Sequence, residues 1–190
     1  MARPKSEDKY NALLAATITV CSELGLEAPT SKIARTAGVA EGTLFTYFKT
    51  KDELLNHLYL ELKKEMGQVM LFNYPRTLTL HKRMYFVWSK YINWGAHNPD
   101  KRKVMGQLSV SDRITAESRA AGRVIFSEAA VLLDECLKNS KIQNSSCAFI
   151  SAMMLAMADT TIDFIIREPV EAEHYCNAGF DAFWRVLAND

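Results

Sequence analysis

A run of small and polar side chains between residues 41 and 47 carries the chemistry best suited to molecular recognition in this sequence. The run consists of Glu41, Gly42, Thr43, Thr46 and Tyr47, interleaved with apolar residues. On a short helix this spacing places the polar groups on one face, and a helix that enters a DNA major groove needs such a face. We therefore expect these residues to contact DNA.

Two short helices joined by a glycine turn are predicted to position this face. Ile33, Ala34 and Ala37 stand at helical spacing before Gly38, whose freedom at positive φ suits a helix end followed by a tight turn. The buried side of the second helix is predicted to comprise Leu44, Phe45 and Phe48. This arrangement is typical of a helix-turn-helix.

The contacts expected with DNA follow from side-chain chemistry. Thr43 can donate a hydrogen bond to a base edge or present its methyl group to thymine, and Gly42 lets the backbone approach closely. Contacts with the sugar-phosphate chain are expected from Thr30, Ser31, Thr46, Tyr47 and Lys51, and minor-groove contacts from Arg3 and Lys5. Tyr47 and Lys51 also fit plain structural roles, and the basic arm also fits disorder.

Composition indicates a globular protein without an overall basic character. The sequence has 190 residues, 48% of them hydrophobic, and a formal net charge of +1. Residues 1–65 contain nine Lys or Arg and nine Asp or Glu, so any attraction to DNA must come from local placement. Four scattered cysteines without a Cys-x-x-Cys spacing, and no secretory signal, favour a reduced cytoplasmic location. We expect no membrane span, because no uncharged apolar run reaches about 18 residues.

Helical periodicity covers most of the sequence, with no strand candidate, so we predict an all-α fold of about nine helices. The predicted helices cover residues 6–24, 31–37, 41–47, 51–72, 76–97, 99–108, 113–137, 147–166 and 170–187. Ser6 is expected to cap the first helix and Gly25 to end it. The helix at 147–166 is almost wholly apolar, so we expect it to be buried on nearly all sides.

Several motifs resemble, in order and spacing, the N-terminal signature of the TetR family of bacterial transcriptional repressors. They are the first-helix start, Ile33-Ala34, Ala37-Gly38-Val39, Gly42-Thr43-Leu44-Phe45, Tyr47-Phe48 and Lys51-Asp-Glu-Leu. The resemblance implies a DNA-binding domain at 1–50 and a ligand-binding and dimerisation domain at 51–190, joined by the helix starting near Lys51. This chain departs from the family at Ala40, where a Ser or Thr commonly caps the recognition helix.

The resemblance further implies a ligand-released repressor that binds palindromic double-stranded DNA as a homodimer, without a metal or other cofactor. Further stretches, such as Thr160-Thr-x-Asp-Phe, resemble more narrowly a family member that governs multidrug efflux. The dimer interface is expected on the last two long helices, at Met153, Met157, Phe164, Phe180, Phe183 and Trp184. The same apolar side chains also fit the core of a single chain.

The middle helices are expected to hold a small inducer that is flat and either apolar or cationic, since aromatic rings and flexible thioethers suit such molecules. The expected ligand residues are Tyr59, Met66, Met70, Trp88, Tyr91, Ile92, Ser151, Met154 and Asp159. Aromatic and methionine stripes at helical spacing also fit a plain core. Asp159 also fits a hydrogen bond to a threonine or tryptophan across that core.

Other classes of function are less well supported by the residues. The sequence has no glycine-rich phosphate loop, no Gly-x-Ser-x-Gly and no metal-ligand spacing, and its four histidines are isolated, so we expect no enzyme. Two alternatives remain open, namely a helical protein-binding module that does not bind DNA and a transcriptional activator.

Overall fold

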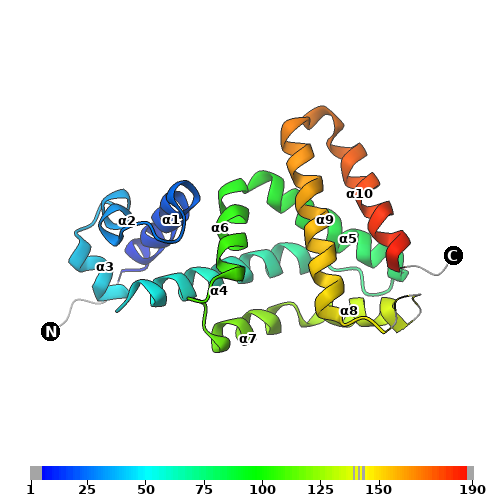
Figure 1. Ribbon diagram of the computed structural model, residues 1–190, viewed down its shortest axis with the longest axis horizontal. Coiled ribbons are helices and arrows are strands. Elements are labelled where there is room, and N and C mark those ends of the chain that lie inside the picture. The colour runs from blue at the N-terminus through cyan, green and yellow to red at the C-terminus, as the bar shows by residue number, and fades with distance from the viewer. Residues whose placement is uncertain (1–5, 139, 141, 143, 188–190) are drawn as a thin grey trace. The chain divides into compact units, whose positions relative to one another are not determined.

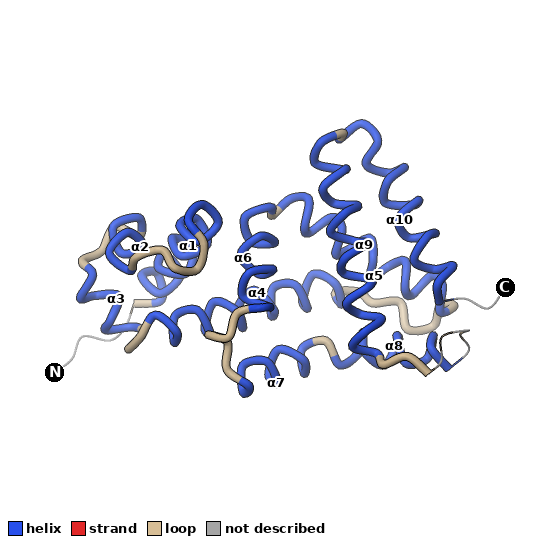
Figure 2. The backbone as a smooth tube through the Cα atoms, viewed as in Figure 1, coloured by secondary structure: helices blue, strands red, loops and turns tan. Residues whose placement is uncertain are grey.

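The computed structural model describes residues 6–138, 140, 142 and 144–187, which form helices and loops without a strand (Figure 2). The expected contacts of Arg3 and Lys5 lie outside these residues. The helices are α1 (Glu7–Leu24), α2 (Thr30–Thr36), α3 (Glu41–Tyr47), α4 (Lys51–Leu71), α5 (Leu80–His97), α6 (Pro99–Val110), α7 (Ala116–Ile125), α8 (Ser127–Lys138), α9 (Cys147–Arg167), the 3-10 turn η1 (Pro169–Glu171) and α10 (Ala172–Leu187) (Figure 1). The all-α prediction is confirmed.

The tenth α-helix arises because the helix predicted at 113–137 is two helices. The chain turns at Phe126, whose amide donates to the carbonyl of Arg123, three residues back instead of four. No glycine or proline stands at this break, so the apolar pattern alone runs through it. The prediction of one helix there is wrong.

The chain divides into two compact units, each built from two segments. The first unit contains Met1–Lys64 and Pro99–Gly122, and the second contains Glu65–Asn98 and Arg123–Asp190. Helices α4 and α7 therefore each continue from one unit into the other. The following description treats each unit by itself.

In the first unit, α1 packs against α2 and α6, and α2 packs against α3. The core that joins them includes Leu13, Ile33, Leu44 and Phe48, all of which have no exposed surface. Two glycine turns fall where the sequence predicts them, with φ of +78° at Gly25 and +69° at Gly38. Both backbone conformations favour glycine, so the two turns follow directly from the sequence.

In the second unit, α9 packs against α5, α8 and α10, and α10 also packs against α5. Trp88 of α5 lies in its core, stacked on Phe183 of α10 with ring centroids 6.0 Å apart. Gly179 lets α10 approach α9 closely, because a Cβ there would collide with the Thr161 hydroxyl and lie 3.0 Å from the Trp88 ring. Burial of these rings is a major part of the stabilisation of this unit.

Helix α9 is not buried on nearly all sides, as the sequence predicts. Its exposed apolar side chains within the single chain are Phe149, Leu155, Phe164 and Ile166. The polarity pattern cannot distinguish burial within one chain from burial by a second one, which explains the error. By length and composition α9 is also the one helix among the described residues that could cross a membrane, with 28% of its most apolar window buried. A single helix of this kind is weak evidence for a span.

Candidate nucleic-acid interface and ligand site

Helix α3 turns its apolar residues Leu44 inward and its small and polar residues outward. Leu44 is fully buried, while Glu41, Gly42 and Thr46 are exposed and Thr43 is half-buried. At 100° per residue, Gly42 and Thr46 point opposite Leu44, and Thr43 flanks them. The polar face predicted from the sequence therefore exists as an open surface of α3.

Phe45 belongs to this surface and not to the core, so its prediction as a buried residue is wrong. Its side chain is 42% exposed, whereas Phe48, three residues on, is fully buried. On the helical wheel Phe45 lies about 100° from Leu44, beside the open face instead of beneath it. We call Gly42, Thr43, Phe45 and Thr46 together the α3 surface.

Two of the hydroxyls expected to contact phosphate already have partners within the chain. The Thr30 hydroxyl donates to Glu41 Oε1 at 2.6 Å. The Tyr47 hydroxyl accepts from the Ser6 amide at 2.8 Å and donates to the Ser6 carbonyl at 3.2 Å. Tyr47 thus links the end of α3 to the start of α1, and a phosphate contact by either hydroxyl would require an exchange of these bonds.

The loop between α3 and α4 carries a cap that the sequence reasoning missed. Thr50 Oγ1 accepts from the Glu53 amide at 3.0 Å, and Glu53 Oε2 accepts from the Lys49 amide at 2.7 Å. The spacing of Thr50 and Glu53 matches a capping box, so the signal was present in the sequence. Lys51 follows at the first position of α4, half-buried, and Ser31 is exposed at the start of α2.

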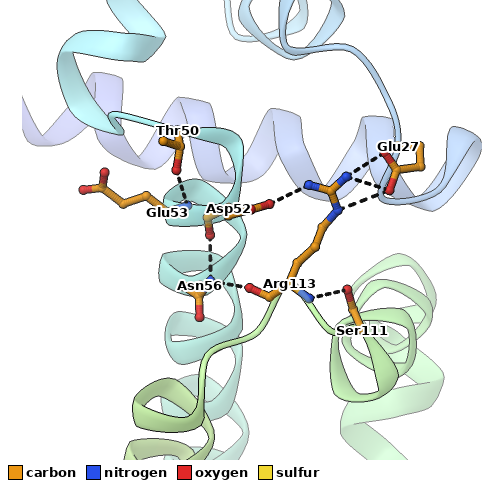
Figure 3. Close-up of polar contacts among 7 residues, drawn as sticks. All are labelled: Glu27, Thr50, Asp52, Glu53, Asn56, Ser111 and Arg113. Carbon is orange, nitrogen blue, oxygen red and sulfur yellow. Dashed lines mark hydrogen bonds and ion pairs between the residues drawn. The ribbon is translucent and has the colours of Figure 1, made fainter.

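A second missed feature joins three elements of the first unit through Arg113 (Figure 3). Its guanidinium donates to both carboxylate oxygens of Glu27, at 2.8 and 2.9 Å, and to Asp52 Oδ1 at 2.6 Å. Hydrogen bonds from Asp52 and then Glu27 raise the pKa of Arg113. The sequence offers no local signal for this cluster, since Glu27 and Arg113 are 86 residues apart.

Beside this cluster the first unit has a surface hollow of about 390 Å³. It is lined by Thr50, Asp52, Glu53, Asn56, His57, Leu60, Thr115 and Ser118. Among the described residues no group of three His, Cys, Asp or Glu side chains is arranged to hold a metal ion.

The nine expected ligand residues fall in both units. Tyr59 lies in the first unit, where its ring contacts Gly122, and the other eight lie in the second. Met66, Met70, Trp88, Tyr91 and Ile92 are buried, and Ser151, Met154 and Asp159 are half-buried. Trp88 Nε1 donates to the carbonyl of Cys176 at 3.0 Å, and the Tyr91 hydroxyl donates to Asp159 Oδ1 at 3.3 Å. The partner of Asp159 is thus a tyrosine, not a threonine or tryptophan.

Two of the six expected dimer residues cannot meet a second chain. Phe180 and Phe183 are 1% and 0% exposed, because both pack on Trp88 within the second unit. This part of the interface prediction is wrong. Phe164 is 40% exposed, and Met153, Met157 and Trp184 are half-buried, so these four still reach the surface of the single chain.

Comparison with known proteins assigns this fold and the helix-turn-helix to a class. Residues 13–58 match the family model of the bacterial regulatory proteins, tetR family. The structure of a TetR family transcription regulator from Marinobacter aquaeolei VT8 superposes with a TM-score of 0.86, at 19% identity, over 97% of each chain. Residues 13–58 are therefore a TetR-family DNA-binding domain, and the described chain has the TetR fold.

Particular relatives extend this likeness. The fatty acid metabolism regulator protein of Bacillus subtilis is 33% identical over 93 residues, 47% of this chain. The match spans 48% of that relative, about half its length. FadR from Bacillus subtilis, solved in complex with stearoyl-CoA, has a TM-score of 0.68 at 22% identity, over 95% of this chain and all of that one. LfrR from Mycobacterium smegmatis, solved with proflavine, has a TM-score of 0.69 at 14% identity, over 97% of this chain and 99% of that one.

Proposed function

We propose that this protein is a ligand-responsive transcriptional repressor that binds a palindromic DNA site as a homodimer. The α3 surface is the observation that carries this proposal. It combines a backbone open at Gly42 with the hydroxyls of Thr43 and Thr46, on a helix anchored by Leu44. A Cβ at Gly42 would meet nothing within 4 Å, so the space there is open to a duplex.

A dimer follows from the shortness of this helix and from the exposed side of α9. A seven-residue recognition helix reads few base pairs, and a two-fold mate doubles the reading. The exposed Phe149, Leu155 and Phe164 of α9 supply apolar area that a second chain can cover. Phe164, Met153, Met157 and Trp184 stay within the proposed interface.

The inducer belongs to one of two chemical classes. A flat cation agrees with the aromatic and methionine side chains of the second unit, with the proflavine complex of LfrR, and with the sequence resemblance to the multidrug-efflux regulator RamR. A long-chain acyl thioester agrees with the match to a fatty acid metabolism regulator and with the stearoyl-CoA complex of FadR. Displacement of bound DNA by proflavine or by stearoyl-CoA distinguishes the two.

Selection of bound duplexes from a random DNA pool tests the proposal most broadly. We expect a palindromic motif whose half-sites are spaced by about one helical turn. Enrichment of no motif would refute sequence-specific binding, and a single unrepeated half-site would refute the dimer. A protein-binding module without DNA activity would fail this assay, whereas an activator would pass it and be separated by a reporter gene with and without the protein.

Two substitutions test the assigned contacts. Thr43→Ala should lose about 1–3 kcal/mol of discrimination between the selected site and its variants at one position. Lys51→Ala should weaken binding to all duplexes alike and reduce the salt slope by about one unit. Wild-type behaviour of both variants would refute this placement of α3 and α4 on the duplex.

A further inference from the structure

Arg113 stands in the connection between α6 and α7 and is bonded to two other elements of the first unit. Glu27 lies in the turn between α1 and α2, and Asp52 lies in the first turn of α4 (Figure 3). Besides the bonds given above, Arg113 Nε donates to Glu27 Oε1 at 3.2 Å. One guanidinium therefore holds the turn that leads into the helix-turn-helix and the helix that follows it.

Asn56 of α4 fixes the backbone of the same connection. Its Nδ2 donates to the carbonyl of Arg113 at 2.8 Å and to the carbonyl of Asp52 at 2.7 Å. Its Oδ1 accepts from the Thr115 amide at 2.9 Å. Both amide hydrogens and the amide oxygen of Asn56 thus have partners, and two of the three bonds reach the connection.

The connection is also held from within. Arg119 of α7 donates to the carbonyls of Ser109 and Ser111 at 2.7 and 2.9 Å, at the end of α6. Ile114 is 3% exposed and anchors the middle of the connection in the core of the unit. Arg113 therefore projects from a rigid support and can transmit a displacement of α6 or α7 instead of absorbing it.

The chain path gives this support its significance. The segment Pro99–Gly122 belongs to the first unit, yet at both ends the chain continues into the second unit, which holds eight of the nine expected ligand residues. The remaining covalent connection between the units runs through α4, after Lys64. A change in the second unit can therefore reach the first through α4 or through this segment.

We propose that Arg113 is a positioning residue that couples the connection between α6 and α7 to the helix-turn-helix and so helps to set the position of α3 for DNA binding. This inference rests on the proposed function. The carboxylates of Glu27 and Asp52 are 78% and 55% exposed, so water and salt weaken each ion pair. Such modest bonds suit a switch, since allosteric couplings change affinity by only about 5- to 150-fold.

A triple variant, Glu27→Gln, Asp52→Asn and Arg113→Gln, removes the ion pairs and separates position from charge. The wild-type cluster has a net charge of −1 and the variant has none, so electrostatics alone predicts tighter binding to the DNA phosphates. Loss of position predicts weaker binding to the selected duplex instead. We expect its affinity to fall about 5- to 20-fold, within the range of such couplings, while a scrambled duplex binds as well as before or better.

Hydrogen exchange gives a readout that a merely structural role would not change. In the full-length wild type, the selected duplex should slow amide exchange in residues 109–119, although these residues are not part of the α3 surface. In the triple variant this response should disappear while the melting temperature stays close to that of the wild type. Arg113→Lys, which keeps the charge but loses the planar fork, should give an intermediate loss.

Arg76→Gln is the matched control, because Arg76 makes a comparable two-bond ion pair with Glu128, at 2.6 and 3.0 Å, in the second unit. It should alter neither DNA affinity nor the exchange response. The inference is overturned if the triple variant binds the selected duplex as tightly as the wild type, or if residues 109–119 do not respond to DNA in the wild type. A wild type that binds no duplex would instead overturn the proposed function, before any variant is compared.

Discussion

Phe45 and Phe48 offer a sharp test, because two phenylalanines three residues apart should fail in opposite ways when each is replaced by alanine. Phe48 is fully buried against Tyr10 and His57, with ring centroids 5.5 and 5.4 Å away. Phe45 is 42% exposed on the α3 surface. We expect Phe48→Ala to impair folding and Phe45→Ala to impair DNA binding with the fold intact.

The magnitudes follow from burial. Truncation of a fully buried phenylalanine costs about 3–5 kcal/mol of unfolding free energy. Phe45 has a little over half of its surface covered, which corresponds to about 1–1.5 kcal/mol of transfer free energy. The better helix propensity of alanine returns roughly 0.5 kcal/mol, so the net cost of Phe45→Ala is about 0.5–1 kcal/mol.

Urea denaturation measures the first effect, and anisotropy titration with the selected duplex measures the second. An apolar side chain in the major groove can contact the 5-methyl group of thymine, so Phe45→Ala should lose about 1–3 kcal/mol of binding free energy. Replacement of individual thymines by deoxyuridine removes that methyl group from the DNA. At the contacted position the wild type should lose affinity and Phe45→Ala should not.

Two results would refute this reasoning. If Phe45→Ala destabilised the protein as much as Phe48→Ala does, the side chain would be part of the core. If it bound the selected duplex as the wild type does, the α3 surface would not face DNA at this residue.

Three further predictions concern the stability of the helices. Thr50→Ala should lower the unfolding free energy by about 1 kcal/mol in chemical denaturation, because it removes the cap of α4, and an unchanged value would show that the bond to the Glu53 amide contributes nothing. Gly179→Ala should lower the melting temperature, since its Cβ would collide with Thr161, whereas Gly106→Ala on α6, where a Cβ meets nothing within 4 Å, should leave it unchanged or raise it; equal effects would contradict the close packing of α9 and α10. Burial raises the pKa of Cys136 to about 11, so its thiol should resist alkylation at pH 8 until urea unfolds the protein, and its contribution to stability, present below the unfolded pKa of about 8.5, should be lost as pH rises toward 11; rapid labelling of Cys136 in the folded protein would contradict its burial.

The sequence predicts well those features that depend on local backbone chemistry. Gly25 and Gly38 adopt positive φ where a turn is needed, and α3 and α4 begin at the predicted residues. Thr50 was also within reach, because its spacing from Glu53 is a known cap pattern. These features follow from a few neighbouring residues, so a single sequence suffices to predict them.

The sequence predicts less well those features that depend on which surface covers a side chain. Phe45, Phe180 and Phe183 are equally apolar in the sequence, yet the first is exposed and the other two are buried. The ion pairs of Arg113 join residues 61 and 86 positions apart, and no periodicity reports such distances. Tertiary packing decides both, which is why the sequence misplaced part of the expected interface and missed the Arg113 cluster.

Titration of the full chain against the selected palindrome and a scrambled duplex of equal composition tests the central claim most directly. The α3 surface should give the palindrome an affinity at least about 1,000-fold higher at physiological salt, with two chains bound per duplex. Equal affinities for the two duplexes, with the same salt dependence, would contradict the claim that this surface reads a DNA sequence.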